Sequence, residues 1–135
     1  MEYKISNSPP DVIYEEAKRK WGVDFENTIF TVGDTIHTKY ELSPDLLAHE
    51  LVHVRQQTEM GTDKWWRKYF SDEFFRLEQE VEAYGAQYKW VLDNKKDRNV
   101  RALLLRAYAK SLSGKMYGDM ISFEASMESI ENNAK

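Results

Sequence analysis

Apolar side chains recur at helical spacing through the second half of the chain. Between residues 74 and 91 they fall three or four positions apart, which places them on one face of a long helix that ends near Asp93. This buried stripe is predicted to comprise Phe74, Leu77, Val81, Tyr84, Tyr88 and Val91. The same spacing predicts shorter helices, which are Trp65–Phe70, Asp97–Leu112 and a last one over Asp119–Glu131 that buries Met120, Phe123, Met127 and Ile130.

The N-terminal segment predicts a short strand followed by a helix. Met1–Ile5 has the composition of an edge strand. Ser8 is then expected to cap a helix, with Pro9 at its first helical position. This helix should run to Trp21 and end at Gly22, because glycine commonly closes a helix.

The next segment predicts a hairpin and a second helix. β-Branched residues on either side of a Gly-Asp pair at 33 and 34 indicate that Thr28–Val32 pairs with Thr35–Tyr40. Ser43–Asp45 then opens a helix that ends at Gly61. The order strand, helix, hairpin and several helices predicts an α+β fold, with a small sheet and a helix-rich second half.

The chain of 135 residues has the length of one domain, so residues 1–135 are predicted to share a single core. Because it has no cysteine, any transition metal must be bound by histidine, aspartate or glutamate. The net charge of −4 gives no reason to expect nucleic acid or an anionic membrane as a partner. Short apolar runs and an N-terminus without a signal pattern predict a soluble, cytoplasmic protein.

Two of the three histidines lie four residues apart in LAHELVHVRQQ, Leu47–Gln57. On a helix, His49 and His53 share one face and can direct both imidazoles at one metal ion. Glu50 lies about 100° round the helix from His49, where it can reach a water on that ion but cannot easily be a third ligand. These are the parts of an H-E-x-x-H site, with two ligands and a general base. The alternative is a helix whose histidines only hydrogen-bond to their neighbours.

A third ligand is predicted on the long helix, which carries Glu78, Glu80 and Glu82. At about 100° per residue, only Glu80 falls within roughly 60° of the centre of the apolar stripe, so the fold directs this carboxylate inward. A buried carboxylate requires a cation, and the pair of histidines lacks an anion. Zinc bound by His49, His53 and Glu80, with a fourth position for water, satisfies both requirements.

The motif HELVH at 49–53, followed by EVEAY at 80–84, resembles the gluzincin metallopeptidases, in which a second helix supplies a glutamate ligand. From residue 29 to 87 the pattern also resembles small zincin-like domains encoded by phages. The resemblance implies a zincin-like fold and a zinc peptidase. In such an enzyme His49, His53 and Glu80 would be the ligands and Glu50 the catalytic base.

The resemblance has further implications around the site. Tyr84 stands where larger members often have an aspartate, so one histidine must be oriented by another carboxylate or by a main-chain carbonyl. Thr35–Thr38 matches the edge strand along which such enzymes align an extended peptide. Stabilising an oxyanion would require a second electrophile besides zinc, and Tyr108, Tyr117 and His37 are equal candidates for it.

The remaining features favour structural roles. Gln56 and Gln57 are predicted to lie on solvated helix surface rather than to line the site. Trp65 and Trp66 are predicted to pack in the core, with one ring partly exposed, rather than to form a platform for substrate. The basic segment at residues 95–110 is predicted to be a solvated helix face rather than a nucleic-acid surface.

Three functions follow from these patterns. The first is a zinc peptidase that hydrolyses an extended peptide or protein. The second is a non-catalytic, phage-type protein that keeps zinc and binds a host protein or a nucleic-acid-associated partner in the host cytoplasm. A zinc amidase of cell-wall peptides is a third, which lacks the support of an export signal.

Overall fold

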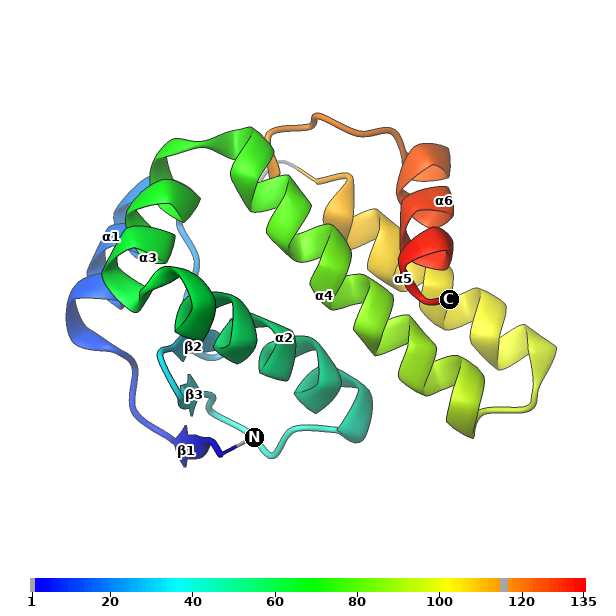
Figure 1. Cartoon of the computed structure of the whole chain (residues 1–135), viewed down its shortest axis with the longest axis horizontal. Helices are drawn as coiled ribbons and strands as arrows, with labels where there is room; N and C mark the ends of the chain where they lie inside the picture. The colour runs from blue at the N-terminus through cyan, green and yellow to red at the C-terminus, as the bar shows by residue number, and fades with distance from the viewer. Residues whose placement is uncertain (1, 115–116) are drawn as a thin grey trace.

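A computed structural model describes residues 2–114 and 117–135 of the chain. It confirms the α+β prediction, with a small sheet at one side and a helix-rich second half (Figure 1). The elements in chain order are β1 (Lys4–Ser6), α1 (Asp11–Trp21), β2 (Phe30–Val32), β3 (Thr35–His37), α2 (Pro44–Met60), α3 (Thr62–Ser71), α4 (Glu73–Asn94), α5 (Arg98–Leu112) and α6 (Phe123–Asn133).

The order of the strands corrects one prediction about the site. The sheet has the order β1-β3-β2, in which β1 runs parallel to β3 and β2 runs antiparallel to it. The strand at Thr35–His37 is therefore the central strand and not the predicted edge. The edge strand that faces the site is β2, because β1 occupies the other side of β3 and Phe30 and Thr31 line the cavity.

Two boundaries in the N-terminal segment also differ from the prediction. Strand β1 begins at Lys4 rather than at residue 1, and Met1 lies outside the described residues. Helix α1 begins at Asp11, and its N-cap position is taken by Pro10 without any side-chain hydrogen bond, so Ser8 is not the cap. Gly22 ends α1 as predicted, in a left-handed conformation with φ of 66°.

The second half contains the two long helices that frame the site. Helix α2 packs against α4, and α6 lies across α4 and α5 (Figure 1). The predicted apolar stripe of α4 is confirmed from Leu77 to Val91, but Phe74 is 58% exposed and Phe75 is buried in its place. Phe75 contacts the ring of Trp65, so the first turn of α4 faces α3 rather than α5 and α6.

The last helix begins later than predicted. Gly118 and Asp119 both have positive φ angles, which a helix does not accommodate, and α6 starts at Phe123 after Ser122 caps it. Met120, predicted as a core position, is 44% exposed. Ile130 is fully buried, as expected.

Two hydrophobic clusters result, and the candidate site lies between them. One cluster joins α1, β2, α3 and the start of α4 around Trp65, Trp66 and Tyr69. The other joins α4, α5 and α6 around Val91, Leu112 and Ile130. No helix in the described parts of the chain has the length and apolar content needed to cross a membrane.

Candidate metal centre

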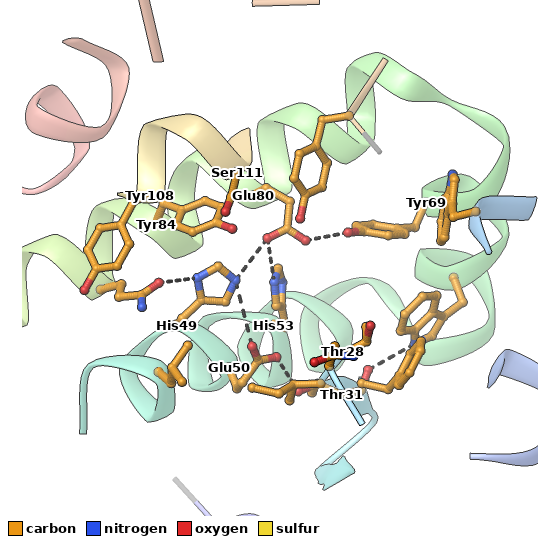
Figure 2. A pocket seen from close by; sticks show the side chains of 18 of the residues that line it. Thr28, Thr31, His49, Glu50, His53, Tyr69, Glu80, Tyr84, Tyr108 and Ser111 are labelled. Atoms are coloured by element: carbon orange, nitrogen blue, oxygen red, sulfur yellow. Dashed lines mark hydrogen bonds and ion pairs between the residues drawn. The ribbon is translucent and has the colours of Figure 1, made fainter. Parts of the chain in front are cut away.

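The three predicted ligands meet in the interior. His49 and His53 lie one turn apart on α2, and Glu80 approaches them from α4 (Figure 2). Glu80 Oε1 lies 3.0 Å from His49 Nε2 and 3.1 Å from His53 Nε2. The three side chains are buried, and one ligand atom from each lies within 4.8 Å of the others. The prediction that Glu80 points inward is confirmed, whereas Glu78 and Glu82 are exposed.

The buried Glu80 carboxylate favours a positive charge at this cluster. Burial alone would raise the pKa of Glu80, but the charge on His53 and hydrogen bonds from both histidines outweigh it and lower that pKa below its ordinary range. Burial alone would lower the pKa of His53, but the charge of Glu80 raises it to about 9. A proton therefore occupies His53 near neutral pH where a metal ion would otherwise supply the positive charge.

The Nδ1 atoms of both histidines contact glutamine side chains. His49 Nδ1 lies 2.9 Å from Gln87 Oε1, and His53 Nδ1 lies 2.9 Å from Gln56 Oε1. An amide oxygen only accepts, so each Nδ1 carries the hydrogen and donates it. Each Nε2 is then the nitrogen available to a metal ion, and both face Glu80 Oε1. Orienting partners of this kind are typical of histidine ligands to metals.

The second oxygen of Glu80 is held by a tyrosine. Tyr69 donates a hydrogen bond of 2.5 Å to Glu80 Oε2, which leaves Oε1 directed at the histidines. Burial, together with the charge of Glu80, raises the pKa of Tyr69 well above its ordinary value, so the hydroxyl keeps its proton. This contact favours ligation through one carboxylate oxygen.

Glu50 lies beside the cluster without belonging to it. Its Oε2 atom is 3.9 Å from His49 Nε2, and its Oε1 atom accepts a 2.9 Å hydrogen bond from Thr31 on β2. The side chain is buried and has a polar partner, so its orientation is fixed from the sheet. The carboxylate therefore lies next to the cluster, and its role as a general base stays a prediction.

A cavity of about 520 Å³ opens onto these side chains. Its walls come from α2 and α4, from residues 27–31 at the edge strand, and from α5 at Ala107, Tyr108 and Ser111. Tyr84 and Ser111 flank one side in Figure 2, and Thr28 and Thr31 the other. The cavity therefore runs between the sheet and α5, with His49 and Glu80 exposed to it.

Neither glutamine after His53 is solvated, which corrects that prediction. Gln56 is 5% exposed and orients His53, as described above. Gln57 is 1% exposed and pairs with the outer edge of β2. Its amide donates to the carbonyl of Thr31 at 2.7 Å and accepts from the backbone of Gly33 at 2.7 Å.

The three candidate electrophiles are not equivalent in the structure. His37 does not line the cavity, and its Nδ1 lies 2.8 Å from the carbonyl of Ser8. Tyr108 lines the cavity, but its hydroxyl donates at 2.6 Å to Asp45. Tyr117 also lines the cavity, and burial together with the nearby charge of Glu80 raises its pKa well above the ordinary value.

The tryptophan pair packs in the core and the basic side chains lie in solvent, each with one difference from the prediction. Trp65 and Trp66 are both buried, at 1% and 6%, so neither ring is partly exposed. The basic segment is solvated except at Arg101, whose guanidinium donates at 2.8 Å to the carbonyl of Leu92 and so closes the end of α4. A carboxylate or main-chain carbonyl was expected to orient one histidine, but the side-chain amides of Gln87 and Gln56 do so instead. The ring of Tyr84 packs edge-on against the His49 imidazole, with centroids 4.6 Å apart.

Sequence reasoning missed several residues around the histidines. Asp45 and Gln87 form a hydrogen-bonded pair of 3.0 Å behind His49, and Thr31 and Tyr69 hold Glu50 and Glu80. Helical spacing contained a signal for the first pair: Asp45 precedes His49 by four residues, and Gln87 follows Glu80 by seven. No comparable signal exists for Thr31 or Tyr69, whose contacts depend on how separate elements pack.

Comparison with known proteins adds no relative. A scan against models of protein families and searches of curated proteins and of solved structures found no match.

Proposed function

We propose that this chain is a zinc-dependent peptidase of the gluzincin type. The observation that carries the proposal is the buried His49, His53 and Glu80 cluster, with the Glu50 carboxylate beside it and a cavity in front of it. A buried site that only stabilised the fold would be closed by its own side chains. Here, the three ligand side chains and Glu50 all line the cavity, so water or substrate could reach an ion held by them, as in a catalytic metal site.

The donor set and its spacing suit zinc. Two imidazoles and a carboxylate are common zinc ligands, at about 2.0–2.2 Å from the ion. Two ligands at such distances around a tetrahedral ion lie about 3.3 Å apart. The separations of 3.0 and 3.1 Å between Glu80 Oε1 and the two Nε2 atoms are within a few tenths of an ångström of that spacing. Small rotations of the side chains would admit the ion.

The residues of the chain then have distinct roles. Zinc, when bound, supplies a Lewis acid that polarises a carbonyl group and acidifies water. Glu50 accepts a proton from the attacking water and delivers it to the leaving nitrogen. Thr31 keeps the Glu50 carboxylate turned toward the cavity through its hydroxyl. Tyr69 and the two glutamines hold the ligands, so that little reorganisation is needed when substrate binds.

Tyr117 is the proposed partner for the oxyanion. It lines the same cavity, and its raised pKa keeps the hydroxyl protonated at neutral pH. Its hydrogen bond goes to the neutral hydroxyl of Tyr84, which an oxyanion would have to displace. Tyr108 is less suited because its proton is held by Asp45.

The substrate is proposed to be an extended peptide that lies along residues 27–30. This segment leads into β2 and forms one wall of the cavity. The outer edge beyond it is already paired, because Gln57 and Trp66 both donate to the carbonyl of Thr31. Backbone pairing with a peptide is therefore confined to the part of the edge before Thr31.

Hydrolysis of peptides tests this proposal. The purified full chain, loaded with one equivalent of zinc, would be incubated with a defined mixture of peptides and the products identified by mass spectrometry. We expect cleavage at internal peptide bonds, its loss on addition of 1,10-phenanthroline, and its return with zinc. If zinc is bound but no peptide of a broad mixture is cleaved, the proposal of a peptidase is wrong and a non-catalytic binder is favoured.

Zinc binding is also expected to release about one proton at pH 7.5, because metal ligation requires neutral imidazoles. In the metal-free chain His53 has a pKa raised to about 9, so it is protonated at this pH and zinc must displace that proton. The release should disappear as the pH rises through 9. Titration calorimetry in two buffers of different ionisation enthalpy measures it, and identical heats in both buffers at pH 7.5 would contradict the expectation.

A further inference from the structure

Asp45 lies behind His49 and is separated from it by the side chain of Gln87. It occupies the first turn of α2, where Ser43 donates to its Oδ1 atom at 2.6 Å. Its Oδ2 atom accepts from the amide of Gln87 at 3.0 Å and from the hydroxyl of Tyr108 at 2.6 Å. Burial would raise the pKa of Asp45, but the hydrogen bonds it accepts outweigh burial and lower it, so the carboxylate is ionised.

An ionised carboxylate can only accept hydrogen bonds, so each polar group that contacts Asp45 must turn a hydrogen toward it. Gln87 must turn its NH₂ group toward Asp45, and its oxygen therefore faces His49 Nδ1. The oxygen in turn keeps a hydrogen on Nδ1, which leaves Nε2 as the coordinating nitrogen.

We propose that Asp45 is a positioning residue for the metal centre, which selects the coordinating nitrogen of His49 by fixing the orientation of the Gln87 amide. The inference rests on metal binding at the proposed site and does not require that the site hydrolyses peptides. In this arrangement, the Gln87 amide lies between the Asp45 carboxylate and the His49 imidazole.

Without Asp45, the amide of Gln87 still faces the Tyr108 hydroxyl, but a hydroxyl can donate as well as accept and does not distinguish the two ends of the amide. Rotation by 180° would then present NH₂ to His49 Nδ1, a geometry that requires a lone pair on Nδ1 and a hydrogen on Nε2. Zinc would bind only after the amide rotates back. The apparent affinity for zinc is reduced by the fraction of molecules in the wrong orientation.

The second histidine provides an internal control. Gln56 orients His53, and its NH₂ group donates to Glu82 at 2.8 Å and also to the main-chain carbonyl of Gln79 at 3.1 Å. A carbonyl can only accept, so the orientation of Gln56 survives the loss of the carboxylate. Glu82→Ala should therefore leave zinc affinity unchanged, although Glu82 stands in the same relation to His53 as Asp45 does to His49.

The test measures zinc dissociation constants of the full chain by competition with a chromophoric chelator. Gln87→Met is expected to weaken zinc binding by about 10- to 100-fold, the usual cost of losing an orienting partner. Asp45→Ala should weaken it by about twofold, because two equally populated orientations of the amide leave half of the molecules able to bind. Tyr108→Phe and Glu82→Ala should bind zinc like the unmodified chain. Circular dichroism would show whether each variant keeps its helices. If Asp45→Ala does not fold, Gln87→Met still tests whether the amide between Asp45 and His49 supports zinc binding.

A rescue separates positioning from a structural role. A glutamate at position 87 has no amide to orient, so the double variant Asp45→Ala/Gln87→Glu should regain the zinc affinity that Asp45→Ala lost. If Asp45 only stabilised the fold, the second change would not restore it. Unchanged affinity of Asp45→Ala or of Gln87→Met, or a double variant as weak as Asp45→Ala, would overturn the proposal. Zinc binding without hydrolysis would refute the peptidase alone and leave this inference standing.

Discussion

Replacing Glu50 with glutamine is expected to leave zinc bound and to lower kcat for peptide hydrolysis by about 100- to 10,000-fold, the contribution of a positioned general base. The amide has the shape of the carboxylate but cannot accept a proton from water. Thr31 can still donate to the amide oxygen, so the local packing is preserved. Because Glu50 is not one of the three ligand side chains, the metal content should not change.

The measurement pairs the rate of peptide cleavage with zinc content by atomic emission. Glu59→Gln is a matched control, since Glu59 also lies on α2 but is exposed and pairs with Arg55. This control should retain both zinc and activity. A Glu50→Gln protein that cleaves peptides at the original rate would exclude Glu50 as the base and would remove the main support for peptidase chemistry.

Replacing Glu80 with glutamine is expected to abolish stoichiometric zinc binding and, with it, all hydrolysis. The change removes the carboxylate whose Oε1 atom lies 3.0 and 3.1 Å from the two Nε2 atoms, and an amide oxygen is a poor ligand for zinc. The loss should exceed the roughly 10- to 100-fold that an orienting partner contributes, because Glu80 is itself a ligand. It should also lower the pKa of His53, which is raised by the charge of Glu80.

Glutamine is chosen because alanine would leave a cavity and remove the hydrogen-bond partner of both Nε2 atoms. Glu78→Gln is the control, as Glu78 is exposed on the same helix. Zinc is measured after dialysis against a weak chelator, and His53 by its imidazole resonances in the metal-free protein. Retention of one zinc per chain in Glu80→Gln would contradict the assignment of the third ligand.

The parts of the site that helical periodicity governs could be predicted from sequence. His49 and His53 are neighbours on any helix, and the apolar stripe around Leu77 and Val91 fixed which glutamate points inward. Both inferences use contacts within one helix. Charge predicted that α2 and α4 lie side by side, because a buried Glu80 requires a cation and the two histidines require an anion.

Features that depend on contacts between distant segments could not be predicted. The parallel pairing of β1 with β3 joins residues about 30 positions apart, and it turned the predicted edge strand into the central one. Phe75 replaced Phe74 in the core because α3 packs against the first turn of α4, which the spacing along α4 does not encode. Gln57 is buried rather than solvated because it pairs with the edge of β2 at Thr31, 26 residues away, and helical spacing does not reveal that contact.

The central claim is that one metal ion is shared by two imidazoles of α2 and one carboxylate of α4. Anomalous diffraction from crystals grown with zinc, recorded on both sides of the zinc absorption edge, tests it most directly. We predict a single strong peak between His49 Nε2, His53 Nε2 and Glu80 Oε1, at about 2.0–2.2 Å from each. No peak at this position, or a zinc ion that Glu80 does not touch, would contradict it.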